Sequence, residues 1–440
     1  MSALAAPAAR AIVRALARGT SLADGIRHIH VGHAGWLAAQ DELLDEIAED
    51  GSSEAKFVRG SYGAGKSHFL GVVQENARAA NWVTAHLECS FDKVEIDRFE
   101  TVYFALTSKL RLPPKDGAPA HGDPLVALLE AWLVELRRSA RIRSDTVSRP
   151  FDADERIWRQ LSEKLHRSGL APDFVTAATA YARAHLDDDR ETTAAVLSWL
   201  KGADRRVPIP ARYSRKPGGA NGRIGGMDQL VPITRGNVVE AMRGLLWLVR
   251  AANFSGLVLC IDEIEELAKI RLRKRQDQAL QALREFVDHA GGQGAFEHLC
   301  MYLAATPEMF ESPDYFARYD ALATRIQPVS KHVNYRAPII DLDRTPLSRA
   351  EMLDMARRIA AVHTVAYPAA TAGGMGEAYL DELLGAVVLA RSRIAKPRLL
   401  ARVVVDELER ARQLASDFAA ADPSEVVATA AAAVSRQAEA

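Results

Sequence analysis

The stretch Gly60-Ser61-Tyr62-Gly63-Ala64-Gly65-Lys66-Ser67 decides the fold. It fits the pattern G-x-x-x-x-G-K-[ST] at every fixed position. The apolar run 55–59 before it is typical of a strand, and the run 68–80 after it is compatible with a helix. Glycines let successive backbone N–H groups curl around phosphates, and the N-terminus of the following helix adds a favourable dipole. A glycine-rich turn that matches by chance would lack this context, so the stretch predicts a nucleoside triphosphate site.

Each residue of this loop has an expected role in holding ATP and Mg²⁺. Lys66 would bridge the β- and γ-phosphate oxygens, and the Ser67 hydroxyl would be a ligand of Mg²⁺. The other residues expected to surround the nucleotide are Gly60, Tyr62, Gly63, Ala64, Gly65 and His68.

A second motif lies at Asp262-Glu263, directly after the unbroken apolar run 257–261. Such a run is typical of a strand buried on both faces of a parallel sheet, and ligands bind at the carboxyl end of such strands. We expect Asp262 to hold Mg²⁺ through water, together with Ser67, and Glu263 to polarise the attacking water. A buried strand that ends in a polar turn is the alternative, but the phosphate loop nearby favours the catalytic interpretation.

Two further polar positions are catalytic candidates. Thr306 follows the apolar run 299–305, where its side chain can contact the γ-phosphate or the attacking water; ordinary helix N-capping explains it equally well. Arg318 and Arg325 precede a predicted strand at 337–342. We favour Arg325 as an arginine that reaches the γ-phosphate on a neighbouring subunit, which implies a homo-oligomer, although an ion pair within the chain is the alternative.

Two other segments are assigned to the nucleotide. Val31 and Gly32 lie ahead of the first predicted strand. In phosphate-loop ATPases the segment at this position often lines the base pocket, and we expect these two residues to do so. A simple turn ahead of the next helix fits equally well. Arg398 opens the last long predicted helix and would reach back to the phosphates from the C-terminal helices.

Size and composition describe an ordinary globular chain. It has 440 residues, of which 48% are hydrophobic and 26% charged, with a formal net charge of −1. We therefore expect two or three domains in a cytoplasmic protein, with no membrane span and with nucleic-acid contact only through a local patch. The three cysteines, Cys89, Cys260 and Cys300, all fall in or at the end of predicted strands, where a free thiol behaves as a small apolar side chain.

Two basic segments are candidates for DNA contact. The first, 201–223, is broken by Pro and Gly and is predicted to be a flexible loop; a solvated surface loop is as good an interpretation as a DNA-backbone contact. Its DNA-binding candidates are Arg205, Arg206, Arg212, Arg215 and Lys216. The second, 269–275, lies near the start of a long helix predicted over 268–290.

The pattern divides the chain into five parts. They are an N-terminal helix with the first half of the nucleotide-binding domain (1–111), a helical insertion with the basic loop (112–235), the second half of that domain (236–345), a helical lid (346–422) and a flexible tail (423–440). Within the insertion, helical periods are expected at 124–139, 152–168, 172–186 and 190–200.

The five predicted strands, with the phosphate loop after the first and Asp262-Glu263 after the third, resemble the additional-strand P-loop ATPases of the AAA+ kind. That resemblance implies an α/β fold with a parallel sheet of order 5-1-4-3-2 and a C-terminal helical lid. The lid segment Lys396-Pro397-Arg398 is similar to the sensor-two region of the origin-recognition/Cdc6-like branch.

Three segments more narrowly resemble the BrxD family of ATP-binding proteins from bacterial BREX phage-defence systems. They are the helix 9–19 leading to His30-Val31-Gly32, the stretch 60–70, and 321–326. The resemblance implies an ATPase that acts on DNA or on a DNA-processing partner such as a helicase. A nucleotide-gated switch or scaffold with little hydrolysis is the alternative, but a water-polarising carboxylate at Glu263 favours hydrolysis.

Overall fold

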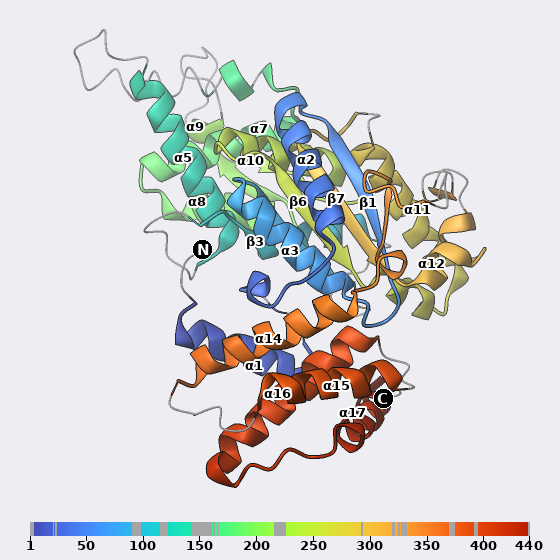
Figure 1. Cartoon of the computed structure of the whole chain (residues 1–440). Helices are drawn as coiled ribbons and strands as arrows, with labels where there is room; N and C mark the ends of the chain where they lie inside the picture. The colour runs from blue at the N-terminus through green and yellow to red at the C-terminus, as the bar shows by residue number, and fades with distance from the viewer. Residues whose placement is uncertain are drawn as a thin grey trace.

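A mostly parallel sheet forms the centre of the larger of two lobes (Figure 1). The computed structural model describes residues 4–20, 22, 24–89, 98–114, 122–142, 161, 163–165, 167–214, 226–291, 294–318, 322–323, 326, 332–368, 375–390 and 395–438. Over these residues the sheet has six strands: β1 (Ser53–Arg59), β2 (Val83–Glu88), β3 (Leu110–Arg111), β6 (Leu257–Asp262), β7 (Leu299–Ala305) and β8 (Ile339–Asp341).

The strands lie in the order β3-β2-β6-β7-β1-β8. All neighbouring pairs are parallel except β2 and β3, which are antiparallel. Every residue of β6 and β7 is buried, as expected for central strands covered on both faces. The predicted α/β class with a largely parallel sheet is therefore confirmed, and so is the burial of the three free cysteines. The short edge strand β3 was not predicted.

Helices cover both faces of the sheet. On one face lie α2 (Ala34–Asp50) and α3 (Lys66–Ala79), which bury Trp36, Leu44 and Phe69 against the strands. On the other lie α4 (Phe99–Lys109), α10 (Val238–Ala251) and α11 (Arg273–Ala290). This layering places the carboxyl ends of the strands at the edge that faces the smaller lobe.

Up to residue 200 the insertion is helical where it is described, but it shares the core of the sheet. Its helices are α5 (Pro124–Ile142), α7 (Pro172–Leu186) and α8 (Arg190–Leu200). They bury Leu128, Trp132 and Phe174 in one continuous core with α4 and α10, so the insertion extends the larger lobe. The helix predicted at 152–168 lies largely outside the described residues.

The prediction of a flexible loop at 201–223 is wrong for the part of this segment that the structure describes. There β4 (Val207–Pro210) and α9 (Ala211–Ser214) are ordered, and β4 pairs antiparallel with β5 (Met227–Leu230). Val207, Ile209 and Tyr213 are buried in the larger core, and this burial holds the segment in place.

The long helix predicted over 268–290 begins later than expected. A 3₁₀ helix, η2 (Ile264–Lys269), follows β6, and α11 starts only at Arg273. Ile270 and Leu272 have extended backbones, which breaks the helix between the two segments.

The smaller lobe is a helical bundle built from both ends of the chain (Figure 1). Its helices are α1 (Ala6–Arg18), α14 (Arg349–Ala366), α15 (Glu377–Leu389), α16 (Lys396–Leu414) and α17 (Pro423–Ala438). The apolar face of α1 is buried against the lid helices, so the N-terminal helix belongs with the lid and not with residues 19–111. The expected flexible tail is a helix as far as Ala438, with Val427 buried in the bundle. No helix in the described residues is both long and apolar enough to cross a bilayer.

Candidate nucleotide-binding site

The loop at 60–67 joins β1 to α3, and this confirms the predicted strand–loop–helix context. Gly63 and Gly65 have positive φ angles of 81° and 100°, which side chains rarely adopt. Gly65 is the N-cap of α3, so the helix begins at Lys66. Ser61 donates hydrogen bonds from its backbone nitrogen and its hydroxyl to Asp343, both of 2.8 Å, and this anchors the loop beyond β8.

Lys66 lies folded against its own loop. Its side chain is 8% exposed, and Nζ donates a 2.9 Å hydrogen bond to the carbonyl of Gly60. Nζ is also 3.7 Å from Oε1 of Glu265. Burial raises the pKa of Glu265, an effect that Lys66 opposes, and the buried Oε2 atom of Glu265 has no hydrogen-bond partner among the described residues. Glu265 was not predicted; its only sequence signal is its place two residues after Glu263.

Asp262 and Glu263 lie at the carboxyl end of β6. Asp262 is 2% exposed, and its Oδ1 accepts a 2.9 Å hydrogen bond from the backbone N–H of Glu263. Glu263 has a left-handed backbone, with φ of 58°, at the point where the strand has ended and η2 begins. Burial, and then the nearby carboxylate of Asp262, raise the pKa of Glu263. Within the described residues, no group of three or more His, Cys, Asp or Glu side chains is arranged to hold a metal ion by itself.

These residues surround one cavity of about 420 Å³. From the predicted set, it is lined by Val31, Tyr62, Gly63, Ala64, Gly65, Lys66, Ser67, His68, Asp262, Glu263 and Arg398. Glu88, at the end of β2, and Arg402, one turn after Arg398, also line it and were not predicted. Gly60 and Gly32 are not among the lining residues, although the Gly60 carbonyl is the acceptor for Lys66.

The lid contacts the phosphate loop directly. The guanidinium of Arg398 lies 5.1 Å from the centre of the Tyr62 ring and donates a 3.1 Å hydrogen bond to the carbonyl of Gly19. The backbone N–H of Ala395, the N-cap of α16, donates to the carbonyl of Tyr62 at 3.4 Å. Arg398 thus joins α1, the lid and the loop at the wall of the cavity.

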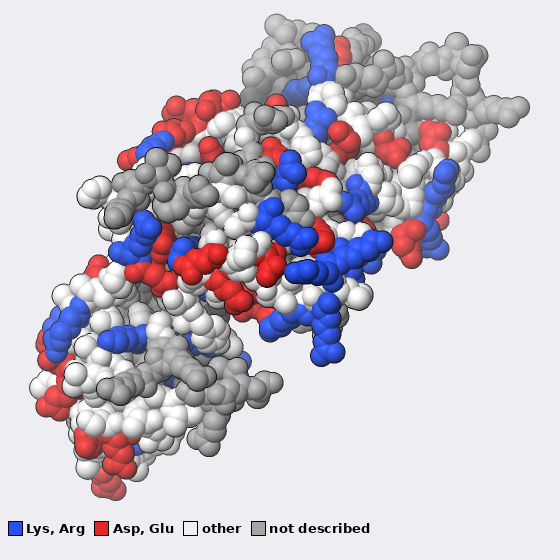
Figure 2. All heavy atoms as spheres, turned by 90° about the vertical axis from the view of Figure 1, so that its right-hand side faces the viewer, with Lys and Arg blue, Asp and Glu red and all other residues white. Residues whose placement is uncertain are grey.

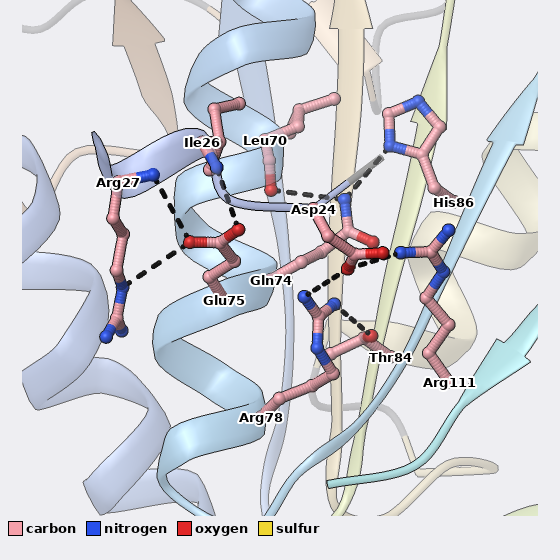
Figure 3. A network of polar contacts seen from close by, with 10 residues as sticks. All are labelled: Asp24, Ile26, Arg27, Leu70, Gln74, Glu75, Arg78, Thr84, His86 and Arg111. Carbon is pink, nitrogen blue, oxygen red and sulfur yellow. Dashed lines mark hydrogen bonds and ion pairs between the residues drawn. The ribbon is translucent and has the colours of Figure 1, made fainter. Parts of the chain in front are cut away.

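Residues 24–33, the strap, cross α3 and close another side of the cavity (Figure 3). Glu75 of α3 accepts hydrogen bonds from the backbone nitrogens of Ile26 (3.0 Å) and Arg27 (3.3 Å). Asp24 pairs with Arg78 and Arg111, at 3.6 and 2.9 Å. These contacts hold the apolar side of the strap toward the cavity.

Gly32 lies on the lid side of the strap. Its φ is +72°, and a Cβ atom added there would come within 2.3 Å of Cδ2 of Leu347 and 3.1 Å of Glu351. The position therefore requires glycine for close packing against the start of α14.

Two histidines beside the loop are held neutral. Nδ1 of His30 lies 3.0 Å from Nε2 of His68, and the two rings are stacked. Burial, reinforced by the neighbouring histidines, lowers the pKa of His30 to about 4 and that of His68 to about 3. Both rings are therefore neutral at pH 7. In this contact one ring donates its N–H to the lone pair on the nitrogen of the other ring.

The remaining catalytic candidates either do not line the cavity or lie outside the described residues. Thr306 occupies the N-cap position of α12 (Pro307–Glu311); among the described residues its side chain makes no capping bond and does not line the cavity. Its backbone N–H lies near the Glu265 carboxylate and lowers the pKa of that group, against the larger effect of burial. Arg318 forms an ion pair with Asp277 of α11. Arg325 lies outside the described residues.

The first basic segment is only partly available for a partner. Arg205 and Arg206 are exposed. Arg212, in contrast, forms a 3.0 Å ion pair with Asp189, and its guanidinium lies 4.6 Å from the Tyr213 ring centre. Arg215 and Lys216 lie outside the described residues.

The second basic segment, 269–275, is exposed but carries paired charges. Lys269 pairs with Glu266 at 2.6 Å, and Arg273 pairs with Asp314 at 3.3 Å. On the side of α11 and α12, acidic and basic side chains are interspersed, with a group of basic side chains near the lower edge of the larger lobe (Figure 2).

Comparison with known proteins identifies the family. The family model described as "BREX system ATP-binding protein BrxC/D" matches residues 5–428, which includes both lobes and the whole cavity. A comparison with curated proteins returned no match. Because the match extends over nearly the whole sequence, this chain belongs to the BrxC/D family of BREX system ATP-binding proteins.

Proposed function

We propose that this protein is a Mg²⁺-dependent AAA+ ATPase that couples ATP binding and hydrolysis to action on DNA or on a DNA-processing partner such as a helicase. One observation carries the proposal: Lys66, Ser67, Asp262 and Glu263 line a single cavity. Membership of a family of ATP-binding proteins in a phage-defence system agrees with it.

Two features of the fold support the AAA+ assignment. When the five parallel strands are counted along the chain, the observed order β2-β6-β7-β1-β8 corresponds to 5-1-4-3-2 read from β8. In addition, a C-terminal helical bundle contacts the phosphate loop through Ala395 and Arg398.

The residues that line the cavity suit both the phosphates and the base of ATP. Backbone N–H groups of the loop and the N-terminus of α3 would hold the phosphates. The strap and lid supply apolar lining residues, Ile26, Ile29, Val31 and Met355, that would hold the base. A volume of about 420 Å³ is within the usual range for a small-molecule pocket.

The residues present also fit Mg²⁺. Ser67 and Asp262, which both line the cavity, offer a hydroxyl and a carboxylate, and hard oxygen ligands are what Mg²⁺ requires. Bound Mg²⁺ would neutralise charge on the β- and γ-phosphate oxygens.

Lys66 and Glu263 would perform the protein's part of hydrolysis. Lys66 exchanges its contact with the Gly60 carbonyl for phosphate oxygens when a nucleotide enters. Glu263 orients the attacking water and accepts its proton, and its raised pKa makes its carboxylate a stronger base than an exposed glutamate.

The test compares Glu263→Gln with Glu266→Gln. Glu266 is three residues further on, pairs with Lys269 and does not line the cavity. In Glu263→Gln the rate of ATP turnover should fall by a factor of about 10²–10⁴, while the affinity for ATP should stay within a few fold of the wild-type value. Glu266→Gln should behave as the wild type. Undiminished turnover in Glu263→Gln would overturn the assigned role of Glu263.

Action on DNA or a DNA-processing partner rests on the BREX membership and on surface chemistry. Arg205 and Arg206 are exposed basic side chains suited to phosphate contacts. We propose a homo-oligomer in which Arg325 acts on the nucleotide of a neighbouring subunit.

A further inference from the structure

His86 and Asp262 project from neighbouring strands toward the same helix. In the parallel pair β2–β6, His86 is opposite Cys260 and Glu88 is opposite Asp262. Because alternate residues of a strand point to the same face, His86 and Asp262 share the face covered by α3. Nε2 of His86 lies 3.8 Å from Oδ2 of Asp262.

Gln74 of α3 fixes the other side of the imidazole (Figure 3). Its Nε2 donates to the carbonyl of Leu70 at 3.1 Å and lies 2.9 Å from Nδ1 of His86. A carbonyl oxygen can only accept, so the Leu70 contact sets which end of the Gln74 amide carries the N–H groups. Turning the amide over would bring two oxygens together. Gln74 is 5% exposed, so solvent does not replace either contact.

This orientation determines the tautomer of His86. Because the Gln74 amide donates to Nδ1, that nitrogen must carry a lone pair. The proton of the neutral ring is then on Nε2, which faces Oδ2 of Asp262. Since Oδ1 of Asp262 already accepts the Glu263 N–H, both carboxylate oxygens face a donor.

We propose that Gln74 and His86 are positioning residues for Asp262: they present a fixed N–H to its Oδ2 and so orient the carboxylate that holds Mg²⁺. This inference rests on the proposed function, in which Asp262 holds Mg²⁺. The Gln74–His86 pair also connects Asp262 to α3, the helix that begins at the phosphate loop. Partners that orient a metal ligand commonly change metal affinity by 10- to 100-fold when removed.

A matched pair of substitutions tests the role of each ring nitrogen of His86 by itself. His86→Asn keeps a polar group near the position of Nδ1 and loses the donor facing Asp262. His86→Gln places an amide N–H near the position of Nε2 and keeps that donor. For each variant, the affinity for ATP is measured by calorimetry in EDTA and in Mg²⁺.

His86→Asn should leave the affinity in EDTA within about twofold and reduce the Mg²⁺-dependent gain by about tenfold, and His86→Gln should recover most of that gain. Gln74→Met should also reduce the gain. Its control is Gln40→Met, because Gln40 is likewise a buried helical glutamine that donates to the carbonyl four residues earlier, but it contacts Tyr302 instead of His86.

A second readout needs no nucleotide. The ¹⁵N chemical shifts of labelled histidine, assigned by the signal lost in His86→Asn, should show His86 as the Nε2–H tautomer in the nucleotide-free protein. The Nδ1–H tautomer, or equal behaviour of His86→Asn and His86→Gln in Mg²⁺, would overturn the inference alone. A wild type whose ATP affinity does not respond to Mg²⁺ would contradict the proposed function and, with it, this role of His86.

Discussion

The guanidinium of Arg398 lies 5.1 Å from the ring centre of Tyr62, so the lid and the phosphate loop touch at the wall of the cavity. The same guanidinium bonds to the carbonyl of Gly19 at the end of α1. A side chain in this position connects three parts of the protein that line the cavity.

Removing Arg398 should therefore weaken nucleotide binding more than it weakens the fold. We expect Arg398→Ala to lower ATP affinity by about tenfold to a hundredfold, because a charge-assisted contact to a phosphate contributes roughly 1.5–3 kcal/mol. The control is Arg412→Ala, since Arg412 of α16 also lies over an aromatic ring, that of Tyr367, but away from the cavity. Equal ATP affinity in the two variants would contradict a role for Arg398 at the phosphates.

Gly32 is predicted to be intolerant of alanine. Gly32→Ala should destabilise the protein by about 2 kcal/mol or more, because φ is +72° and the new methyl group would overlap Leu347. At Gly385, inside α15, no atom of the described residues lies within 4 Å of an added Cβ, so Gly385→Ala should stabilise by about 0.5–1 kcal/mol. Urea unfolding of both variants tests this difference in sign.

The buried histidine pair should make the protein less stable in acid. The pKa of His30 falls from 6.5 to about 4 on folding, so below pH 6.5 the unfolded chain takes up a proton before the folded protein does. The free energy of unfolding should then fall as the pH drops from about 6.5 toward about 4, by up to about 1.4 kcal/mol per pH unit for this group.

Urea unfolding between pH 7 and pH 5 measures that slope. His30→Gln removes the titrating ring and should give a shallower pH dependence than the wild type. His28→Gln, two residues earlier, is the control for loss of a histidine in the strap. A slope in His30→Gln as steep as that of the wild type would show that His30 does not supply it.

Arg325 is tested by mixing two inactive proteins. Arg325→Ala retains its own loop, and Lys66→Ala retains its own Arg325. If Arg325 acts across a subunit interface, mixed oligomers contain some complete sites, and part of the turnover should return. If turnover does not return although light scattering still detects oligomers, Arg325 acts within its own subunit.

The sequence predicts the parts of the site that depend on local pattern. Lys66 comes after the short strand β1 and Asp262 ends the short strand β6, and the glycines at 63 and 65 have the left-handed backbone that the loop requires. Such features depend on a few neighbouring residues, so periodicity and motif spacing are enough to find them.

The rest depends on tertiary contacts that local pattern does not encode. Glu265 becomes part of the site only because η2 turns it back toward Lys66. Helix α1 packs with the lid because its apolar face matches α14 and α16, far away in sequence. His86 looks like any strand residue until its partners on α3 and β6 are known.

The most direct test of the proposed function is the rate of ATP hydrolysis by the purified protein in Mg²⁺, with and without single- and double-stranded DNA, using Lys66→Ala as the blank. We predict turnover above the blank and stimulation by DNA. ATP binding without turnover under every condition would contradict the ATPase assignment and favour a nucleotide-gated switch.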